Sequence, residues 1–259
     1  MTTIAQISDT HVAAGTPAAA RRLDDLSRTI EAVNRLRPCP LAVVHTGDVA
    51  HDATGEDYRA ACAVLKRLEL PLYAIVGNRD RRGPFTKAFA GAGYLDAASP
   101  FIQYAVDLGP VRLVAADTLH DESGLGGFCA DRAADLERLL AERPATPTLV
   151  VAHHPPVAVP SLKARNPLQF QDSDEAAALV RVIGRARQVA GVVAGHIHRT
   201  ETVAIAHTTL TTMTSVAADL RRGRDKETDP EAPVFHLHTI AEGRVTMRRV
   251  VVELSETPA

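Results

Sequence analysis

The sequence has no tryptophan and only three cysteines among its 259 residues. Cys39, Cys62 and Cys129 lie far apart and form no CxxC pair. This spacing indicates neither a disulfide framework nor a zinc site built from thiolates. Free cysteines behave as small apolar side chains, so we expect these thiols to be buried in the core.

An excess of charge of one sign is also lacking. The chain carries 29 Lys and Arg against 31 Asp and Glu, a formal net charge of −2 without a basic stripe. We therefore expect neither a nucleic acid nor a membrane as a partner. No apolar run approaches the ~18 residues of a membrane span, and no charged and apolar leader precedes the first strand. These absences predict a cytoplasmic protein.

Linkers rich in proline, glycine or serine are absent, so the sequence predicts one domain over 1–259. Apolar strand-like runs alternate with segments of helical periodicity. This alternation favours parallel strands joined by right-handed helical crossovers. We expect such strands at 3–8, 41–46, 72–76, 148–152 and 191–194, and helices at 21–36, 56–68, 130–141 and 174–186.

Two other regions depart from this alternation. Residues 101–107 and 111–117 flank a Gly-Pro turn and are typical of a β-hairpin. The strand-rich segment 202–254 is expected to add antiparallel strands, and the charged stretch 221–229 within it to be a solvated loop. Together these elements predict the α/β class, as a four-layer α/β/β/α sandwich of two facing mixed sheets flanked by helices.

Five clusters of metal-seeking side chains follow the apolar runs. Side chains at the carboxyl ends of parallel strands meet at one edge of a sheet, and imidazole with carboxylate suits zinc, manganese, iron and cobalt. Where ligands alternate in an extended segment they point the same way, so both could reach one ion. The clusters are Asp9-Thr10-His11, Gly47-Asp48, Gly77-Asn78, His153-His154-Pro155 and Gly195-His196-Ile197-His198.

The ordered set DxH, GD, GN, H and GHxH resembles the calcineurin-like metallophosphoesterase superfamily. The His-His-Pro-Pro and Gly-His-Ile-His segments, together with the chain length, are similar to those of bacterial class III cyclic-nucleotide phosphodiesterases and glycerophosphodiesterases. The resemblance implies two divalent ions (Mn, Zn, Fe or Co) that share one carboxylate. The first ion would take Asp9, His11, Asp48 and His198, and the second would take Asp48, Asn78, His153 and His196.

The resemblance also implies the reaction. Two ions ~3.5–4 Å apart would hold a hydroxide for in-line attack on a phosphoric ester, which makes Asp48 and Asn78 catalytic. His153 is preferred to His154 as a ligand, because the family ligand lies two residues before the first proline. Consecutive strand residues also point to opposite faces, so we do not expect both histidines to be ligands.

One position departs from the family pattern. Relatives continue Gly-Asn with His, a candidate proton donor, whereas this chain reads Gly77-Asn78-Arg79-Asp80. Arginine stays charged and cannot act as a general acid, but it can grip a phosphate. Our hypothesis is that Arg79 binds the phosphate, and that a metal-bound water or a nearby histidine such as His154 protonates the leaving group. The alternative is a solvent-facing Arg79 paired with Asp80.

Other histidines have plainer interpretations. His45 lies inside a strand and is expected to be a satisfied core residue. His236 and His238 alternate on a late strand without a third ligand nearby, so we expect them on the sheet surface. His51 and Asp52 are either polar groups beside the site or part of an ordinary loop.

Residues 155–171 form a long polar segment with four prolines. Such loops in compact domains are often lids over active sites. As a lid, the segment would bring Lys163, Arg165 and Gln169 to the substrate; an ordinary surface loop is the alternative.

The leading functional hypothesis is a metal-dependent phosphodiesterase. Its partner would be a small-molecule phosphate ester, of the cyclic nucleotide or glycerophosphodiester type. A phosphomonoesterase is the first alternative, since Arg79 would favour a dianion, and a non-catalytic scaffold of the same fold is the second. The late strands and the lid could also support a homodimer.

Overall fold

A five-stranded sheet forms one half of the protein in a computed structural model, which describes residues 1–162, 167–228 and 231–253. Its strand order is β11 (Arg244–Val251), β10 (Val234–Ala241), β1 (Thr2–Ile7), β2 (Val43–His45) and β3 (Leu72–Ala74). β1, β2 and β3 are parallel, as predicted, and β10 and β11 join as an antiparallel pair.

A six-stranded sheet faces it. Its strand order is β4 (Tyr104–Asp107), β5 (Arg112–Ala115), β6 (Thr148–Val151), β7 (Val189–Ala194), β9 (Thr208–Thr212) and β8 (Glu201–Ile205). β4 and β5 form the predicted hairpin, and β5, β6 and β7 are parallel. β9 is antiparallel to β8, as predicted for the late strands. It also runs parallel to β7, which was not predicted, because the chain first passes through β8 and then turns back beside β7.

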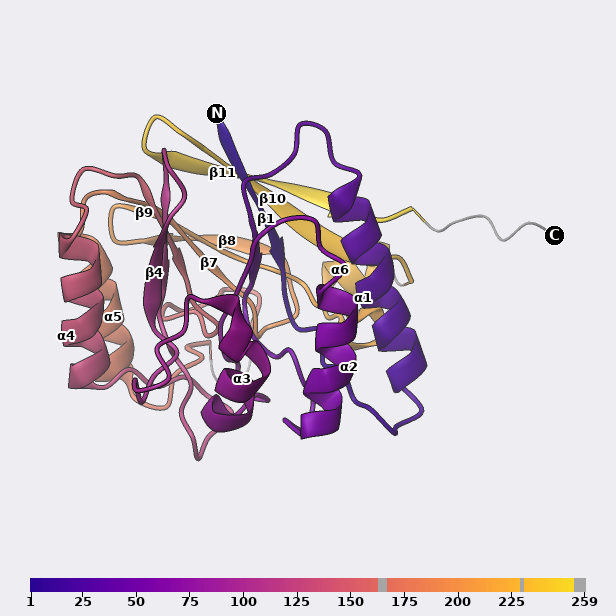
Figure 1. The fold of residues 1–259 in the computed structure, drawn as a ribbon. Helices are drawn as coiled ribbons and strands as arrows, with labels where there is room; N and C mark the ends of the chain where they lie inside the picture. Colours follow the sequence, from indigo (N-terminus) through magenta and orange to yellow (C-terminus); the bar gives the residue numbers. More distant parts are fainter. Residues whose placement is uncertain (163–166, 229–230, 254–259) are drawn as a thin grey trace.

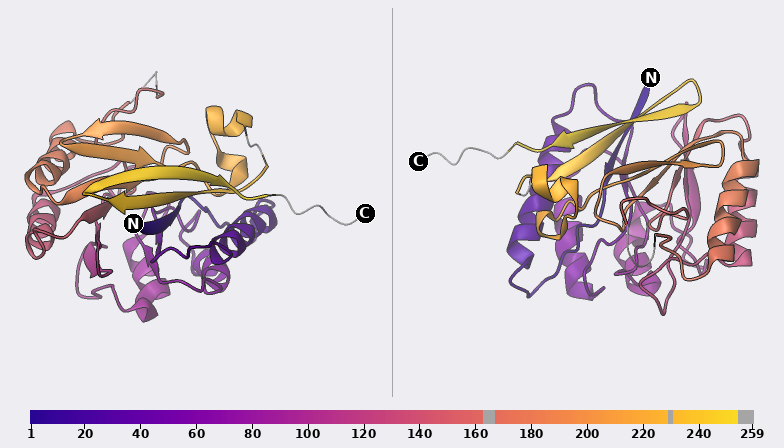
Figure 2. Two further views of the ribbon diagram at one scale, coloured as in Figure 1. Left: turned by 90° about the horizontal axis from the view of Figure 1, so that it is seen from above. Right: turned by 180° about the vertical axis from the view of Figure 1, so that it is seen from behind.

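Helices cover the outer faces of both sheets. Figure 1 shows two pairs of long helices on opposite sides of the molecule, and Figure 2 shows the strands between them from above and from behind. The predicted α/β fold with two facing mixed sheets is thereby confirmed. The helices are α1 (Ala19–Asn34), α2 (Gly55–Leu65), α3 (Arg82–Phe89), α4 (Ala130–Ala141), α5 (Ser173–Arg185) and α6 (Arg224–Thr228), with short 3₁₀ turns η1 (Ala90–Ala92) and η2 (Ala218–Leu220).

The sequence explains where the helices begin and which side they bury. Leu26, Ile30 and Val33 recur at helical spacing on α1 and are fully buried against the first sheet. α2 begins at Thr54, whose side chain accepts from the backbone N–H of Asp57 in a reciprocal capping box. These local signals fix the crossovers that carry the chain from one strand end to the next.

One helix was not predicted, and one local prediction is wrong. α3 was not among the predicted helices; its Pro84 lies in the first turn, where a helix needs no N–H donor. The segment 221–229 is not a solvated loop in its described part. It contains α6, and its Asp225 is buried because it accepts hydrogen bonds from Thr200 and pairs with Arg249.

Two burial predictions also fail. Cys39 is exposed, and Cys62 and Cys129 are only half-buried, because they lie on helix and loop surfaces rather than on core strands. His236 and His238 are fully buried instead of lying on the sheet surface. β10 has strands on both sides. His236 contacts Thr200, between β7 and β8, and His238 bonds to Gln6, which donates to the carbonyl of Ala194 in β7, so the second sheet lies over this face. Within the described residues no helix is long and apolar enough to cross a bilayer.

Candidate metal centre

The candidate ligands follow five strands that belong to both sheets. Those from the first sheet lie after β1, β2 and β3, and those from the second lie after β6 and β7. The structure brings them together at the shared carboxyl edge in two groups, and within each group the ligand atoms lie within 4.8 Å of one another. One group is Asp9, His11, Asp48 and His198, and the other is His153, His154 and His196.

The backbone at this edge is left-handed rather than extended. The candidate ligands with positive φ are Asp9 (52°), His11 (43°), Asp48 (55°), His196 (70°) and His198 (55°). Our expectation of extended segments with alternating side chains is therefore wrong. Non-glycine residues rarely adopt this conformation, and it persists where surrounding contacts hold it, typically at functional sites.

Backbone hydrogen bonds hold these turns against each other. The N–H of Asp9 donates to the carbonyl of Gly47 (3.0 Å), and that of His11 to the carbonyl of Asp48 (2.9 Å). Ser215 Oγ also donates to the carbonyl of Asp9 at 2.7 Å. The loops after β1 and β2 are thus linked residue by residue, which stabilises the strained turns.

The first group surrounds a small space with nitrogen and oxygen atoms. His11 Nε2 lies 3.4 Å from Asp48 Oδ2 and 3.2 Å from His198 Nε2, and His198 Nε2 lies 3.2 Å from Asp9 Oδ1. On its outer side, His198 Nδ1 donates to the carbonyl of Leu220 at 2.8 Å. That bond places the ring proton on Nδ1 and leaves the Nε2 lone pair facing the group.

Two rings of the second group, those of His153 and His196, converge on one amide oxygen. Asn78 Oδ1 lies 3.1 Å from His153 Nε2 and 2.9 Å from His196 Nδ1. His153 Nε2 also lies 3.6 Å from Asp48 Oδ1. Asp48 therefore directs one carboxylate oxygen toward each group.

Outer hydrogen bonds also orient the rings of the second group. His153 Nδ1 donates to the carbonyl of Thr46 at 2.7 Å, which leaves Nε2 free as a donor atom for a cation. His196 Nε2 lies 3.0 Å from Gln169 Oε1, so the proton on Nε2 leaves Nδ1 facing Asn78. In both rings the nitrogen that faces inward is the unprotonated one.

Burial controls the charge of the histidines. It lowers the pKa values of His11, His153 and His196, which favours neutral rings near neutral pH. Burial also raises the pKa of Asp48 to about 6, against the opposing charge of His11. Burial disfavours the ionised form of the Asp48 carboxylate, which a bound cation would stabilise. Neutral imidazoles beside such a carboxylate form a set of ligands suited to divalent cations.

In Asp9 and His198 the effect of charge prevails over that of burial. Burial would raise the pKa of Asp9, but the charge of His198 and hydrogen bonds hold that pKa well below its usual range. Burial likewise opposes protonation of His198, and the charge of Asp9 raises its pKa nevertheless. A cation bound beside Asp9 would compete with a proton at His198 Nε2 and would use the lone pair of that nitrogen instead.

His154 lies in the same cluster as His153. The two rings are 4.7 Å apart, and the ring of His154 is 4.4 Å from that of His196. Our argument that consecutive residues diverge is therefore wrong, because β6 ends at Val151 and the pleat does not extend to these residues. Burial lowers the pKa of His154 well below its usual value, so its ring is neutral at neutral pH.

Asp80 is not the partner of Arg79. It is fully buried, and it accepts hydrogen bonds from Tyr58 Oη (2.8 Å) and from the backbone N–H groups of Gly77 (2.9 Å) and Val49 (3.2 Å). The alternative of a surface ion pair between Arg79 and Asp80 is thus wrong. Asp80 instead joins the loops that carry Asp48 and Asn78, a role that no sequence motif indicated.

Arg79 lies at the mouth of the site. Its backbone N–H donates to Asp48 Oδ1 at 2.7 Å, and its exposed side chain lines two adjoining clefts of about 270 and 430 Å³. Arg222 lines the first cleft as well, a residue that we had placed in a solvated loop. His51 also lines both clefts, and its Nδ1 lies 3.4 Å from His11 Nδ1, so it belongs beside the site.

Other predicted residues have varied outcomes. His45 is a satisfied core histidine, as predicted: its Nε2 lies 3.0 Å from Thr10 Oγ1, and Gly47 N–H donates to its Nδ1. Gln169 reaches the edge of the site through His196. Lys163 and Arg165 lie outside the described residues, so the lid over 155–171 stays a prediction.

Comparison with known proteins agrees with this geometry. The family model for calcineurin-like phosphoesterases matches residues 2–200. The chain belongs to the calcineurin-like phosphoesterase family. It is accordingly a phosphoric ester hydrolase, in a family whose members use divalent metals.

Curated relatives and solved structures extend the comparison. The chain is 28% identical over 242 residues to a probable glycerophosphodiester phosphodiesterase of Arcobacter nitrofigilis, covering 91% of this chain and 87% of the relative. It is 34% identical over 177 residues to a probable cyclic nucleotide phosphodiesterase of Rhodopseudomonas palustris, covering 67% and 62%. A dimetal phosphatase from Danio rerio superposes with a TM-score of 0.69 at 16% identity, over 97% of this chain and 98% of that one, a likeness of fold.

Proposed function

We propose that this protein is a binuclear-metal-dependent phosphodiesterase that hydrolyses small-molecule phosphodiesters. The observation that carries the proposal is the position of Asp48 between two groups of ligands. Its Oδ2 faces His11 at 3.4 Å, and its Oδ1 faces His153 at 3.6 Å. A carboxylate with one oxygen toward each group is the arrangement that a bridging ligand requires.

The proposed ligands follow from the direction of their donor atoms. Asp9, His11, Asp48 and His198 would hold one divalent ion, and Asp48, Asn78, His153 and His196 would hold the other. The mixed imidazole and carboxylate set suits Mn, Zn, Fe or Co, and cellular supply would decide among them. Two such ions would supply an activated water and neutralise charge on the phosphoryl oxygens.

The protein's own groups would position the ester. Arg79 and Arg222 line the cleft above Asp48, where two guanidinium groups can bind the non-bridging oxygens of a phosphate. Arg79 cannot supply a proton, and the neutral ring of His154 is a poor acid. We therefore assign leaving-group protonation to water in the cleft and keep Arg79 as an electrostatic group.

Two observations decide between a diester and a monoester as substrate. The relatives named above are named for diester substrates, of the glycerophosphodiester and cyclic nucleotide types. The two arginines favour the alternative, because a dianionic monoester gains more from fixed cations. We give more weight to the relatives, since their similarity spans most of the chain.

A substrate panel tests this proposal. The purified protein, supplied with Mn, Zn, Co or Fe, would be assayed on bis-p-nitrophenyl phosphate, p-nitrophenyl phosphate, cyclic nucleotides and glycerophosphodiesters. We expect a higher kcat/KM for the diesters with at least one metal, and its loss in Asp48→Ala. Faster monoester hydrolysis would establish the phosphomonoesterase alternative, and no turnover with any metal would favour a scaffold. The cytoplasmic location and a homodimer remain predictions.

A further inference from the structure

A groove lies between α2 and α3, apart from the candidate metal centre and its two clefts. Its volume is about 800 Å³, and it shares no lining residue with the clefts of the metal centre described above. Pockets for small molecules have volumes of about 300–1,000 Å³, so this groove is large enough for an organic ligand. Its lining residues are Gly55, Tyr58, Arg59, Cys62, Ala63, Lys66, Gly83, Pro84, Lys87 and Ala88.

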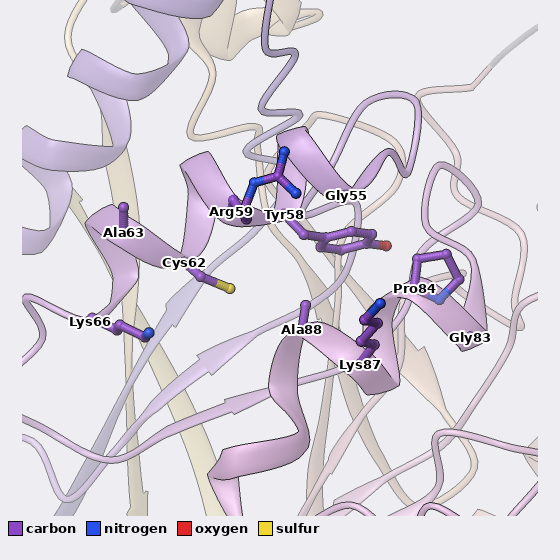
Figure 3. A pocket seen from close by; sticks show the side chains of 10 residues that line it. All are labelled: Gly55, Tyr58, Arg59, Cys62, Ala63, Lys66, Gly83, Pro84, Lys87 and Ala88. Atoms are coloured by element: carbon purple, nitrogen blue, oxygen red, sulfur yellow. The ribbon is translucent and has the colours of Figure 1, made fainter.

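The floor of the groove is apolar. Figure 3 shows Cys62 on one helix and Ala88 on the other facing the same space, with the ring of Tyr58 nearby. Tyr58 packs edge-on against Phe85 beneath it, with ring centroids 6.2 Å apart. An acyl or alkyl chain would meet side-chain carbon and sulfur along this floor.

The rim of the groove is positively charged. Arg59, Lys66 and Lys87 are exposed, and the ten lining residues include no carboxylate. Among residues 1–162, 167–228 and 231–253, no Asp or Glu forms an ion pair with any of these three cations. By contrast, other exposed cations such as Arg138 and Arg67 do pair with neighbouring carboxylates. The rim thus presents three uncompensated charges around an apolar surface.

We propose that the groove between α2 and α3 binds a free single-chain acyl or alkyl anion. The chain would lie on the floor formed by Tyr58, Cys62 and Ala88, and the anionic head would lie between Lys66 and Lys87. Charge complementarity selects an anion over a cation, and the apolar floor selects a chain-bearing anion over inorganic phosphate. The inference does not rest on the proposed function, because it concerns binding at a separate surface.

Tyr58 connects this groove to the metal centre. Its hydroxyl donates to Asp80 at 2.8 Å, and Asp80 accepts from the backbone of Gly77 and Val49. The floor of the groove is therefore linked by hydrogen bonds to the loops that carry Asn78 and Asp48.

Protection of Cys62 from alkylation tests the proposal directly. Iodoacetamide would modify the full chain, and peptide mass spectrometry would read Cys62 and Cys39 in the same molecule. Cys39 is exposed and lies outside the groove, so it is the internal control. The probes, all below their micelle concentrations, are decane-1-sulfonate, decyltrimethylammonium with the same chain, and methanesulfonate with the same head group.

We expect saturating decane-1-sulfonate to slow modification of Cys62 at least tenfold, with the rate at Cys39 unchanged. The other two probes should change the Cys62 rate less than twofold. In the double variant Lys66→Gln and Lys87→Gln, the concentration for half-protection should rise about tenfold. The matched variant Lys226→Gln and Arg244→Gln changes two exposed cations elsewhere and should leave it within twofold.

Several outcomes would overturn the inference. Equal protection by decyltrimethylammonium would mean that the rim charges select nothing, and failure of decane-1-sulfonate would mean that no such anion binds. Cys62 protection that rises with protein concentration alone would assign the groove to a second copy of the chain. Binding to anionic lipid vesicles, without protection by the free anion, would assign it to a membrane surface.

Discussion

Buried histidines occur in two regions of this molecule, and their surroundings differ. His11 and His198 are buried just beyond strand ends, as is the half-buried His196; all three have left-handed backbone and direct a ring nitrogen toward other candidate ligands. His45 and His238 lie within strands β2 and β10 and are fully buried. Their rings bond to Thr10 and Gln6 of the adjacent strand β1 or the loop after it.

The difference shows that burial alone does not mark a candidate metal ligand. Regular strand geometry alternates side chains between two faces, so it cannot converge several rings on one point. A left-handed turn at the strand end re-aims the side chain toward the common edge. We therefore expect substitutions at the strand ends to lower activity more than stability, and substitutions within the strands to lower stability more than activity.

Replacing one histidine in each region by alanine gives the largest expected difference between an effect on activity and an effect on stability. His196→Ala removes an inward-facing nitrogen, and we expect kcat/KM to fall about 10³-fold with little change in thermal unfolding. His236→Ala leaves a cavity within β10 and should cost about 2–3 kcal/mol of unfolding free energy, with kcat/KM within threefold. Steady-state kinetics and urea unfolding of both variants would check this. Loss of activity in a fully folded His236→Ala would break the comparison.

The left-handed edge should also be intolerant of added atoms. A Cβ at Gly195 would overlap Ser8 Oγ and lie 2.6 Å from Asp9 Oδ2. Gly195→Ala should displace Asp9 and lower kcat/KM about 10²-fold, since small misplacements of catalytic groups have effects of that size. Gly91→Ala, where a Cβ meets nothing within 4 Å, is the matched control and should behave as wild type. Full activity in Gly195→Ala would show that Asp9 need not hold its position.

Arg79 sharpens the comparison because it stands where the family pattern described above implies a histidine. Arg79→Ala should lower kcat/KM by about 10- to 100-fold, because a charge-assisted contact to the phosphate is lost. Arg79→Lys should recover part of the loss, and thermal stability should not change, since the side chain is exposed. Arg187→Ala, an exposed arginine elsewhere, provides the control. If neither Arg79 variant changes kcat/KM, the residue has no role in binding the ester.

The smallest expected effect is the pH dependence of the unfolding free energy that the buried His238 causes. Burial lowers the pKa of His238 to about 3, whereas an exposed histidine titrates near ~6.5. Because the folded-state pKa is the lower one, the cost of His238 is absent above pH ~6.5 and grows as the pH falls toward about 3. At pH 5 it amounts to ~2 kcal/mol.

His238→Leu should therefore lose less unfolding free energy than wild type between pH 7.5 and pH 5, by ~2 kcal/mol. Urea unfolding at both pH values measures this difference, and any constant effect of the substitution cancels. An identical pH dependence in the two proteins would mean that His238 is accessible to protons in the folded state.

Much of the fold and the ligand set could be predicted from local sequence. Apolar runs followed by His, Asp or Asn indicated both the strand ends and the residues that gather there, since parallel strands share a carboxyl edge. The capping box at Thr54 and the apolar periodicity of α1 likewise act over a few residues, so their effects can be read without the fold.

The remainder depended on contacts between distant segments. The left-handed turns at Asp9 and Asp48 are held by hydrogen bonds between two loops, which no single segment encodes. The alternative of a surface pair between Arg79 and Asp80 failed because Asp80 bonds to the loop after β2 and to Tyr58 on α2, which lie far from it in the sequence. The burial of His236 and His238 follows from a second sheet that covers β10, which alternation along one strand cannot show.

The most direct test of the central claim is a manganese titration followed by electron paramagnetic resonance. If Asp48 bridges two ions, the wild-type chain should bind two Mn²⁺ and give an exchange-coupled spectrum. Asp48→Ala should bind one or none and give an uncoupled signal. A wild-type chain that binds a single uncoupled Mn²⁺, or coupling that persists in Asp48→Ala, would contradict the account.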